Sequence, residues 1–172
     1  NSGVITKENT FEKAFIGDAL LFPALSIVDP ELMATVPPAF TAYQGFDALF
    51  HSTEGYIARG ANLMSDMYAL TAIENIAKYL PRAVKDGNDM EARTHVAWGN
   101  TLSGVVMCLT LITSEHALEH ALSAYHPALP HGAGLIMVSK AYYKYFVEHH
   151  ACDDRFIRMA QAMGMPEATK AE

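Results

Sequence analysis

Apolar residues recur every three to four positions along most of the chain after Pro38, which predicts a mainly α-helical protein. The first long helix is expected over residues 39–58, with an apolar stripe made of Phe46, Leu49, Phe50, Thr53 and Ile57. A second helix is expected to begin near Ser65 and to end at Pro81, because proline removes a backbone donor. Further helices are predicted over residues 90–111, 132–149 and 153–164, with a shorter one from residue 114 to the loop at 126–130.

The first 28 residues follow a different pattern. Residues 3–6, 13–16 and 24–28 are short segments that are partly β-branched or aromatic, and residues 7–9 read as a turn. This pattern predicts a small β hairpin or ribbon at the start of the chain. Asp29 then reads as a helix N-cap and Pro30 as the first position of a short helix.

The composition narrows the possible partners. Hydrophobic residues make up 51% and charged residues 18% of the 172 positions, which indicates a chain with a buried interface or an interior part of a larger protein. The net charge of −7 and the scattered basic residues argue against binding to nucleic acid.

Lys140 and Lys144 interrupt the most apolar run, which therefore reads as a buried, central helix rather than a membrane span. Two cysteines without a paired motif, and no visible signal peptide, favour the cytoplasm.

A group of polar residues stands out against this apolar background. Asp47 and His51 are four residues apart in a predicted helix, so both side chains leave the same face one turn apart. His116 and His120 have the same spacing, and His131 follows in a Pro-His-Gly turn. One carboxylate oxygen with three imidazole nitrogens is a ligand set that a divalent iron or zinc ion accepts. The pattern therefore indicates a metal site rather than helix packing alone.

Other interpretations of these residues remain open. A single polar pair at this spacing is usually a surface pair, although apolar neighbours flank Asp47. His126 could replace His131 as a ligand. Residues 116–120 match the His-x-x-Glu-His pattern of zinc peptidases, in which Glu119 would be the general base and Glu148 a possible third ligand.

Further expectations concern two glutamates near this group, His95, and the class of protein. Glu115 and Glu119 are expected to be solvated, or to pair with His or Arg, rather than to act as a base. His95 is expected to be solvated. A helical metal-binding module without enzymatic activity is a further alternative to an enzyme.

Several stretches of sequence carry a specific resemblance. Residues 45–56, which read Gly-Phe-Asp-Ala-Leu-Phe-His-Ser-Thr-Glu-Gly-Tyr, resemble the metal-binding signature of iron-containing alcohol dehydrogenases. The upstream residues 27–32 and 36–38 resemble the segment that leads into that signature, and His116-x3-His120 with Pro130-His131-Gly132 resembles the second signature. The similarity runs in order over essentially the whole chain.

The resemblance implies a fold and a set of roles. The fold would be the multi-helix C-terminal-type domain of the dehydroquinate synthase-like fold, with residues 29–172 as a helical metal-binding domain incomplete at its C-terminus. Residues 1–28 would be the β remnant of a missing nucleotide-binding domain. The metal ligands, for Fe²⁺ or Zn²⁺, would be Asp47, His51, His116 and His131. His120 would be a catalytic residue near the nicotinamide and the substrate.

The implied reaction is reversible hydride transfer between NAD(H) or NADP(H) and a small alcohol or aldehyde. The full-length protein would be an iron-containing, NAD(P)-dependent alcohol dehydrogenase, and we expect it to be a homo-oligomer. No Gly-rich phosphate-binding loop occurs in these 172 residues, so we expect that the chain alone neither binds NAD(P)H tightly nor oxidises alcohols.

Overall fold

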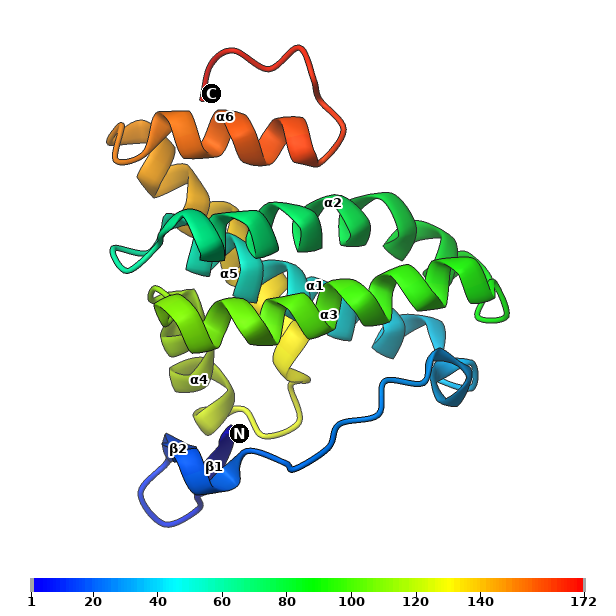
Figure 1. The fold of residues 1–172 in the computed structure, drawn as a ribbon. Coiled ribbons are helices and arrows are strands. Elements are labelled where there is room, and N and C mark those ends of the chain that lie inside the picture. The colour runs from blue at the N-terminus through cyan, green and yellow to red at the C-terminus, as the bar shows by residue number, and fades with distance from the viewer. Residues whose placement is uncertain (1, 172) are drawn as a thin grey trace.

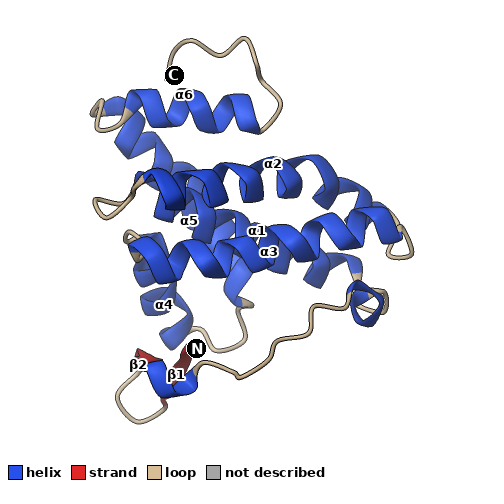
Figure 2. Cartoon of the chain, in the orientation of Figure 1, coloured by secondary structure: helices blue, strands red, loops and turns tan. Residues whose placement is uncertain are grey.

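The computed structural model describes residues 2–171, which form a small N-terminal hairpin followed by a set of helices (Figure 1). Two short 3-10 helices, η1 (Ala19–Leu21) and η2 (Pro30–Met33), lie in the segment that joins the hairpin to the helices. The α-helices are α1 (Pro38–Ile57), α2 (Leu63–Lys85), α3 (Met90–Thr110), α4 (Glu115–Tyr125), α5 (His131–Glu148) and α6 (Asp153–Ala162). The predicted mainly α-helical fold with a short N-terminal hairpin is confirmed (Figure 2).

Helices α1, α2 and α3 pack together around an apolar core. One cluster joins Ala48 of α1 to Ile76 and Leu80 of α2, and all three side chains are buried. A second cluster, nearer the other end of these helices, comprises Tyr56, Ala69, Ile73, Val106 and Met159. This packing accounts for the regular apolar spacing in the sequence, and it holds α1 rigidly along its length.

Helix α5 lies against the other side of α1, and α4 packs on α5 and reaches α1 through the side chain of His116. The start of α5 approaches α1 very closely, because a Cβ atom added to Gly132 would lie 2.2 Å from the backbone oxygen of Tyr43. Only glycine allows this approach. The neighbouring His131, which is the first residue of α5, is thereby held next to α1.

The hairpin consists of β1 (Ser2–Lys7) and β2 (Glu12–Gly17), which pair antiparallel with Val4 opposite Phe15. The prediction of a third strand-like segment at residues 24–28 was wrong, because this stretch is extended but pairs with no strand among the described residues. Helix η1 and Pro23 separate it from the hairpin, and proline has no backbone donor for a ladder. Strand β2 packs against α4, which brings Lys13 close to that helix.

Two predicted helices differ from those observed. Helix α2 continues beyond Pro81 to Lys85, because burial of Leu80 and Ala83 against neighbouring helices outweighs the missing donor of the proline. Helix α5 is not central, since only Gly132, Gly134, Leu135 and Tyr142 are buried in it.

Among the described residues no single helix has the length and apolarity of a membrane span. Helices α3 and α4 reach the length and apolarity of a membrane span only when they are taken together, and the chain bends by 107° between them.

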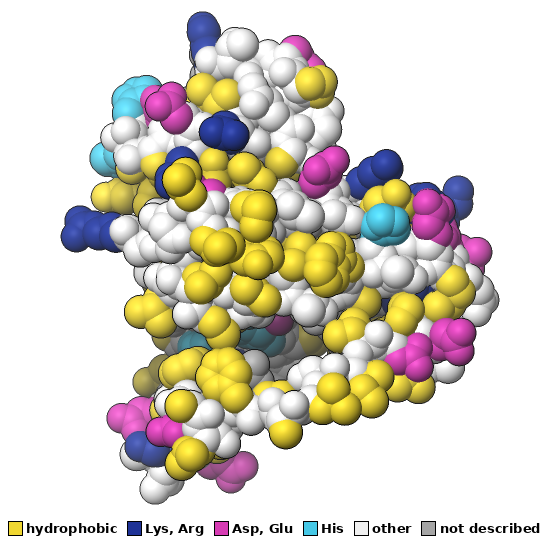
Figure 3. Space-filling view, viewed as in Figure 1, with side chains coloured by type: hydrophobic (Ala, Val, Ile, Leu, Met, Phe, Trp, Pro, Cys, Tyr) yellow, Lys and Arg dark blue, Asp and Glu magenta, His cyan; other side chains and the backbone are white. Residues whose placement is uncertain are grey.

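Large apolar side chains remain exposed on parts of the surface. Figure 3 shows hydrophobic side chains gathered over α2 and α3 and along the N-terminal segment. The most exposed examples in these regions are Leu20, Leu25, Ile27, Leu32 and Leu63. Exposed apolar groups of this size are typical of surfaces that pack against other protein.

Candidate metal centre

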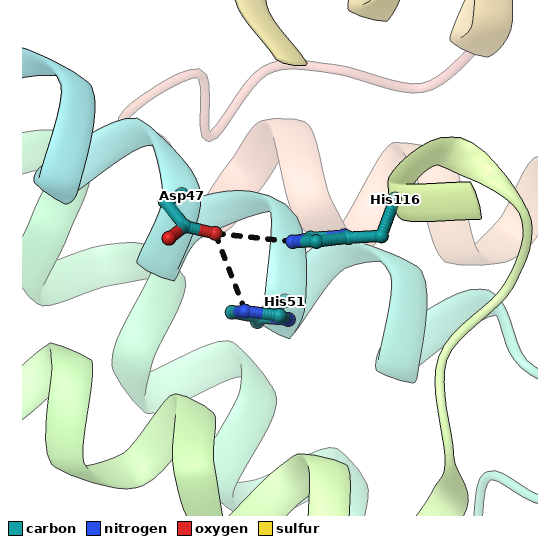
Figure 4. Close-up of side chains that lie close together, drawn as sticks. All are labelled: Asp47, His51 and His116. Carbon is teal, nitrogen blue, oxygen red and sulfur yellow. Dashed lines mark hydrogen bonds and ion pairs between the residues drawn. The ribbon is translucent and has the colours of Figure 1, made fainter. Parts of the chain in front are cut away.

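The side chains of Asp47, His51, His116 and His131 meet between α1, α4 and α5. Figure 4 shows Asp47 and His51 of α1 and His116 of α4 pointing toward one another. The Oδ1 atom of Asp47 lies 3.0 Å from Nε2 of His116, 3.2 Å from Nε2 of His51 and 3.7 Å from Nε2 of His131. The same nitrogen of all three imidazoles therefore faces one carboxylate oxygen.

The imidazole rings of this group are close together and differ in exposure. The rings of His51 and His116 stack with their centroids 3.9 Å apart, and the rings of His116 and His131 are 5.4 Å apart. The side chain of His116 is 4% exposed, whereas those of His51, His131 and Asp47 are 20%, 30% and 32% exposed. The group is thus buried at His116 and open to solvent on the side of Asp47 and His131.

The surroundings shift the pKa values of this group in opposite directions. Burial lowers the pKa of His116, but its hydrogen bonds to Asp47 and Glu54 outweigh burial and raise the pKa to about 9. Burial and the neighbouring charge of His116 lower the pKa of His51 to about 4. Burial raises the pKa of Asp47, but the hydrogen bond from His116 and the charges of the three histidines bring it below its usual value. A positive charge is therefore favoured on His116 and disfavoured on His51.

The donor set fits a divalent cation. Four donors at the bond lengths of zinc sites in a tetrahedral arrangement are about 3.4 Å apart. The separations of 3.0, 3.2 and 3.7 Å around Asp47 Oδ1 lie close to that value. An anionic oxygen with three imidazole nitrogens also matches the preference of divalent iron and zinc. The donor atoms of Asp47, His51 and His116 all lie within 4.8 Å of one another, and Nε2 of His131 lies beside this group at 3.7 Å from Asp47 Oδ1. These three residues, with His131 as the neighbouring fourth donor, could therefore hold one such ion.

Two buried carboxylates contact the outer nitrogens of these histidines. Glu54 of α1 accepts a hydrogen bond from the backbone N–H of His116 at 2.9 Å, and its Oε1 lies 3.2 Å from Nδ1 of the same residue. Glu119 of α4 contacts Nδ1 of His131 through Oε2. Both glutamates are fully buried. No role was predicted for Glu54, although the same His-x-x-Glu spacing occurs at residues 51–54 and 116–119 and could have drawn attention to it.

The other expectations for nearby residues have mixed outcomes. Glu119 was expected to be solvated or to pair with a histidine or arginine, and it pairs with His131. Glu115 was expected in the same way, but its side chain is fully buried rather than solvated. Burial raises the pKa of the Glu115 carboxyl to about 7. His126 is exposed on the loop after α4. His95 was expected to be solvated but is only partly exposed, since its ring stacks on Tyr79 and hydrogen-bonds Asn75 at 2.7 Å.

His120 lies beside the group without joining its centre. Its ring centroid is 5.3 Å from that of His131 and 6.3 Å from that of His116. Burial and the charge of His131 lower the pKa of His120 to about 4, so the ring is neutral near pH 7. A neutral imidazole at this place can accept a proton from a group bound close to His131.

A cavity of about 500 Å³ adjoins the group on the side of α3 and η2. Asp47 forms part of its wall, together with Gln44 and Gly45 of α1. Apolar side chains cover much of the remainder, among them Ile27, Val28, Leu32, Met33, Val96 and Ala97. A small organic molecule therefore has room next to Asp47.

Comparison with known families decides the classification of the chain. Residues 41–172 match the family model described as "Fe-containing alcohol dehydrogenase family, C-terminal". The chain belongs to this family. The predicted resemblance is thus confirmed, and the homologues are alcohol and diol dehydrogenases, which makes the chain part of an oxidoreductase family.

Individual relatives agree with this classification. The chain is 40% identical to alcohol dehydrogenase 4 of Schizosaccharomyces pombe over 129 residues, which cover 75% of this chain and 30% of the relative. It is 36% identical to the NAD-dependent methanol dehydrogenase of Bacillus methanolicus over 129 residues, which cover 75% and 34%.

A solved structure extends the comparison to the fold. The alcohol dehydrogenase from Oenococcus oeni superposes with a TM-score of 0.91 at 29% identity, covering 99% of this chain and 44% of that one. The chain therefore spans less than half the length of each of these three proteins.

Proposed function

We propose that this chain is the metal-binding part of an iron-containing, NAD(P)-dependent alcohol dehydrogenase. Asp47, His51, His116 and His131 hold one divalent ion, Fe²⁺ or Zn²⁺. The observation that carries this proposal is the convergence of three Nε2 atoms on Asp47 Oδ1, from three different helices. Membership of the iron-containing alcohol dehydrogenase family supports it independently.

The chemistry of the site follows from these side chains. A bound divalent ion acts as a Lewis acid on the oxygen of an alcohol or aldehyde. Asp47 supplies the one anionic donor, so the site favours a cation while remaining accessible on its exposed side. Because hydrogen bonds to Asp47 and Glu54 raise the pKa of His116 to about 9, this residue would have to give up a proton in order to hold the ion.

His120 is the catalytic residue that we assign to proton transfer. Its ring lies beside the proposed ligands, with its centroid 5.3 Å from that of His131, where it would take up the hydroxyl proton during oxidation of an alcohol and return it in the reverse direction. The neighbouring cavity beside Asp47 gives a small alcohol or aldehyde room next to the site. NAD(H) or NADP(H), bound by the rest of the full-length enzyme, would supply the hydride acceptor or donor.

The wider organisation is part of the same proposal. Residues 1–28 belong to the β part of a nucleotide-binding domain and residues 29–172 form the metal-binding domain. The exposed apolar side chains of the N-terminal segment, such as Ile27 and Leu32, support packing against that domain and a homo-oligomeric enzyme. A cytoplasmic location is expected.

The zinc-peptidase alternative has less support. Its general base would be Glu119, but this carboxylate is fully buried and engaged with Nδ1 of His131. The alternative would also leave the contacts of Asp47 with three histidines unused. A metal-binding module without enzymatic activity remains compatible with the geometry, and family membership favours the dehydrogenase over it.

Metal stoichiometry of the purified chain tests the proposal. The chain is loaded with Zn²⁺, or with Fe²⁺ under anaerobic conditions, passed over a desalting column and analysed for metal. We expect one equivalent in the wild-type chain and none in His116→Ala. The matched control is His126→Ala, which removes an exposed histidine and should keep one equivalent. Loss of metal in the His126 variant, or full occupancy in His116→Ala, contradicts the proposed ligand set.

A further inference from the structure

The sequence His-x-x-Glu occurs on two of the three helices that present a histidine to the candidate metal centre. His51 is followed by Glu54 on α1, and His116 is followed by Glu119 on α4. Residues three apart on a helix share a face, so each glutamate lies beside the histidine of its own helix. Each glutamate nevertheless contacts the histidine of the next helix instead.

Glu54 extends from α1 to the start of α4. Its Oε1 accepts the backbone N–H of His116 at 2.9 Å and lies 3.2 Å from Nδ1 of that ring. Ser114, the N-cap of α4, makes no side-chain capping bond. Glu54 therefore supplies the negative charge that favours a helix N-terminus, and it binds the outer nitrogen of His116 at the same time.

Glu119 extends from α4 to the start of α5 and is enclosed on several sides. Its Oε2 contacts Nδ1 of His131, and Nζ of Lys13 in β2 lies 3.7 Å from the same oxygen. Lys13 also donates a hydrogen bond of 2.7 Å to Ser123 on α4. On the other side, a Cβ atom added to Gly134 would lie 2.8 Å from Glu119 Oε1. The carboxylate therefore has little freedom to turn.

We propose that Glu54 and Glu119 are positioning residues, which hold Nδ1–H of His116 and of His131 so that Nε2 of each ring faces Asp47. This inference rests on the proposed metal site. A carboxylate on the outer nitrogen of a ligand histidine fixes both the tautomer and the ring orientation. The arrangement forms two successive links: Glu54 of α1 orients His116 of α4, and Glu119 of α4 orients His131 of α5.

His51 lacks such support. Its Nδ1 atom is buried and has no hydrogen-bond partner among the described residues. The rings of His116 and His131 are thus each oriented by a carboxylate, whereas the ring of His51 is held mainly by packing.

A second cation site formed by Glu119, His120 and His131 would be the competing use of the same groups. The ammonium group of Lys13 lies 3.7 Å from Glu119 Oε2. Its positive charge would repel a second cation at this carboxylate. Binding of a second equivalent of metal that depends on Glu119 would support this alternative against the positioning role.

Metal affinity of the chain provides the first test. Co²⁺ binding to the wild-type chain is measured by competition with a chelator, and the same is done for Glu54→Gln and Glu119→Gln. We expect one equivalent in each case and an affinity that is weaker by about 10- to 100-fold in the variants. The control is Glu148→Gln, which removes an exposed glutamate of α5 and should bind as the wild type does. Unchanged affinity in both Glu54→Gln and Glu119→Gln overturns the inference.

The outcome also separates the two proposals. If the wild-type chain binds one equivalent of metal and His116→Ala binds none, the proposed ligand set is supported. The affinities of Glu54→Gln and Glu119→Gln then test the positioning role alone. If the wild-type chain binds no metal, the proposed function fails, and the positioning role is judged from the metal-free chain by the next measurement.

Nitrogen-15 NMR of the histidine rings reads the positioning directly. In the metal-free wild-type chain we expect protected, downfield Nδ1–H protons for His116 and His131, because each is donated to a carboxylate. Glu119→Gln should alter the His131 signal and leave that of His116, and Glu54→Gln should do the reverse. Lys13→Met, a milder change on the hairpin, should shift only the His131 signal. An unprotonated Nδ1 in both wild-type rings contradicts the inference, as does a His131 signal that is the same in Glu119→Gln and Lys13→Met as in the wild type.

Discussion

Helix α1 packs against α2 and α3 on one side and against α5 on the other, where side chains of α4 also reach it, and the two sides differ in chemistry. Toward α2, Ala48 joins Ile76 and Leu80 in an apolar cluster, and Gly45 lies against Leu80. Toward α4 and α5, the same helix presents Asp47, His51 and Glu54. One helix thus forms both the core and the candidate metal centre.

The difference shows how the fold separates stability from chemistry. Burial of the apolar side stabilises the chain by removing hydrocarbon from water. Burial of Glu54 and Glu119 costs free energy unless their charges are compensated, which here depends on histidines of neighbouring helices. Substitutions on the apolar side should therefore change stability, and substitutions on the polar side should change metal binding or turnover.

The largest expected effect concerns His120. In a full-length enzyme that contains this chain, His120→Ala should slow turnover by about 10²- to 10⁴-fold, the usual contribution of a general acid or base. The isolated variant should still bind one equivalent of metal, because the ring lies beside the group and is not one of the four ligands that we propose. Turnover and metal content are measured on the same preparations. Loss of the metal together with activity would favour the zinc-peptidase arrangement of His116, Glu119 and His120.

The apolar side is tested at Ile76, which is fully buried between α1 and α3. Ile76→Ala should lower the free energy of unfolding by about 2–5 kcal/mol, because it leaves a cavity in the core. Urea unfolding of the chain measures this change, and metal stoichiometry below the transition should stay at one. The matched control is Ile27→Ala, since Ile27 is 81% exposed and should change stability by at most about 0.5 kcal/mol. Equal losses at the two positions would show that the core is misassigned.

A smaller effect is expected at the start of α2. The side chain of Asn62 accepts hydrogen bonds from the backbone N–H groups of Met64 and Ser65 at 3.1 and 3.2 Å. Asn62→Ala should therefore cost about 1 kcal/mol of stability in the same urea experiment. Asn88→Ala, in the exposed loop before α3, serves as the control. A loss at Asn88 as large as that at Asn62 would contradict the capping role.

No effect at all is expected when NADH is added to the isolated chain. The sequence lacks a Gly-rich phosphate-binding loop, and positioning of the nicotinamide supplies much of the rate of hydride transfer. Titration with NADH, followed by cofactor fluorescence, should show no saturable binding. Binding in the micromolar range, or dehydrogenase turnover by these 172 residues, would place the cofactor site within this chain.

The same contrast explains what the sequence could predict. The helices were predictable because one face of each is apolar at regular spacing, as at Ile73, Ile76 and Leu80 of α2. The continuation of α2 past Pro81 was not, since it depends on burial of Ala83 against another helix. Tertiary contacts override local preference at such places.

The candidate site was partly predictable for a similar reason. The spacing of Asp47 and His51 lies within one helix, so the sequence alone indicates that they are neighbours. The approach of His116 to α1 depends on how α4 packs, and the resemblance to a known family supplied that expectation. The link from Glu54 to His116 crosses 62 positions in the chain, so no local rule could assign it.

Anomalous diffraction from crystals of the chain grown with Zn²⁺ tests the central claim most directly. The account predicts one strong peak, about 2.0–2.2 Å from Oδ1 of Asp47 and from Nε2 of His51, His116 and His131. A single peak between Glu119, His120 and His131 would contradict it, as would the absence of any peak between α1, α4 and α5 in crystals whose metal content is one equivalent.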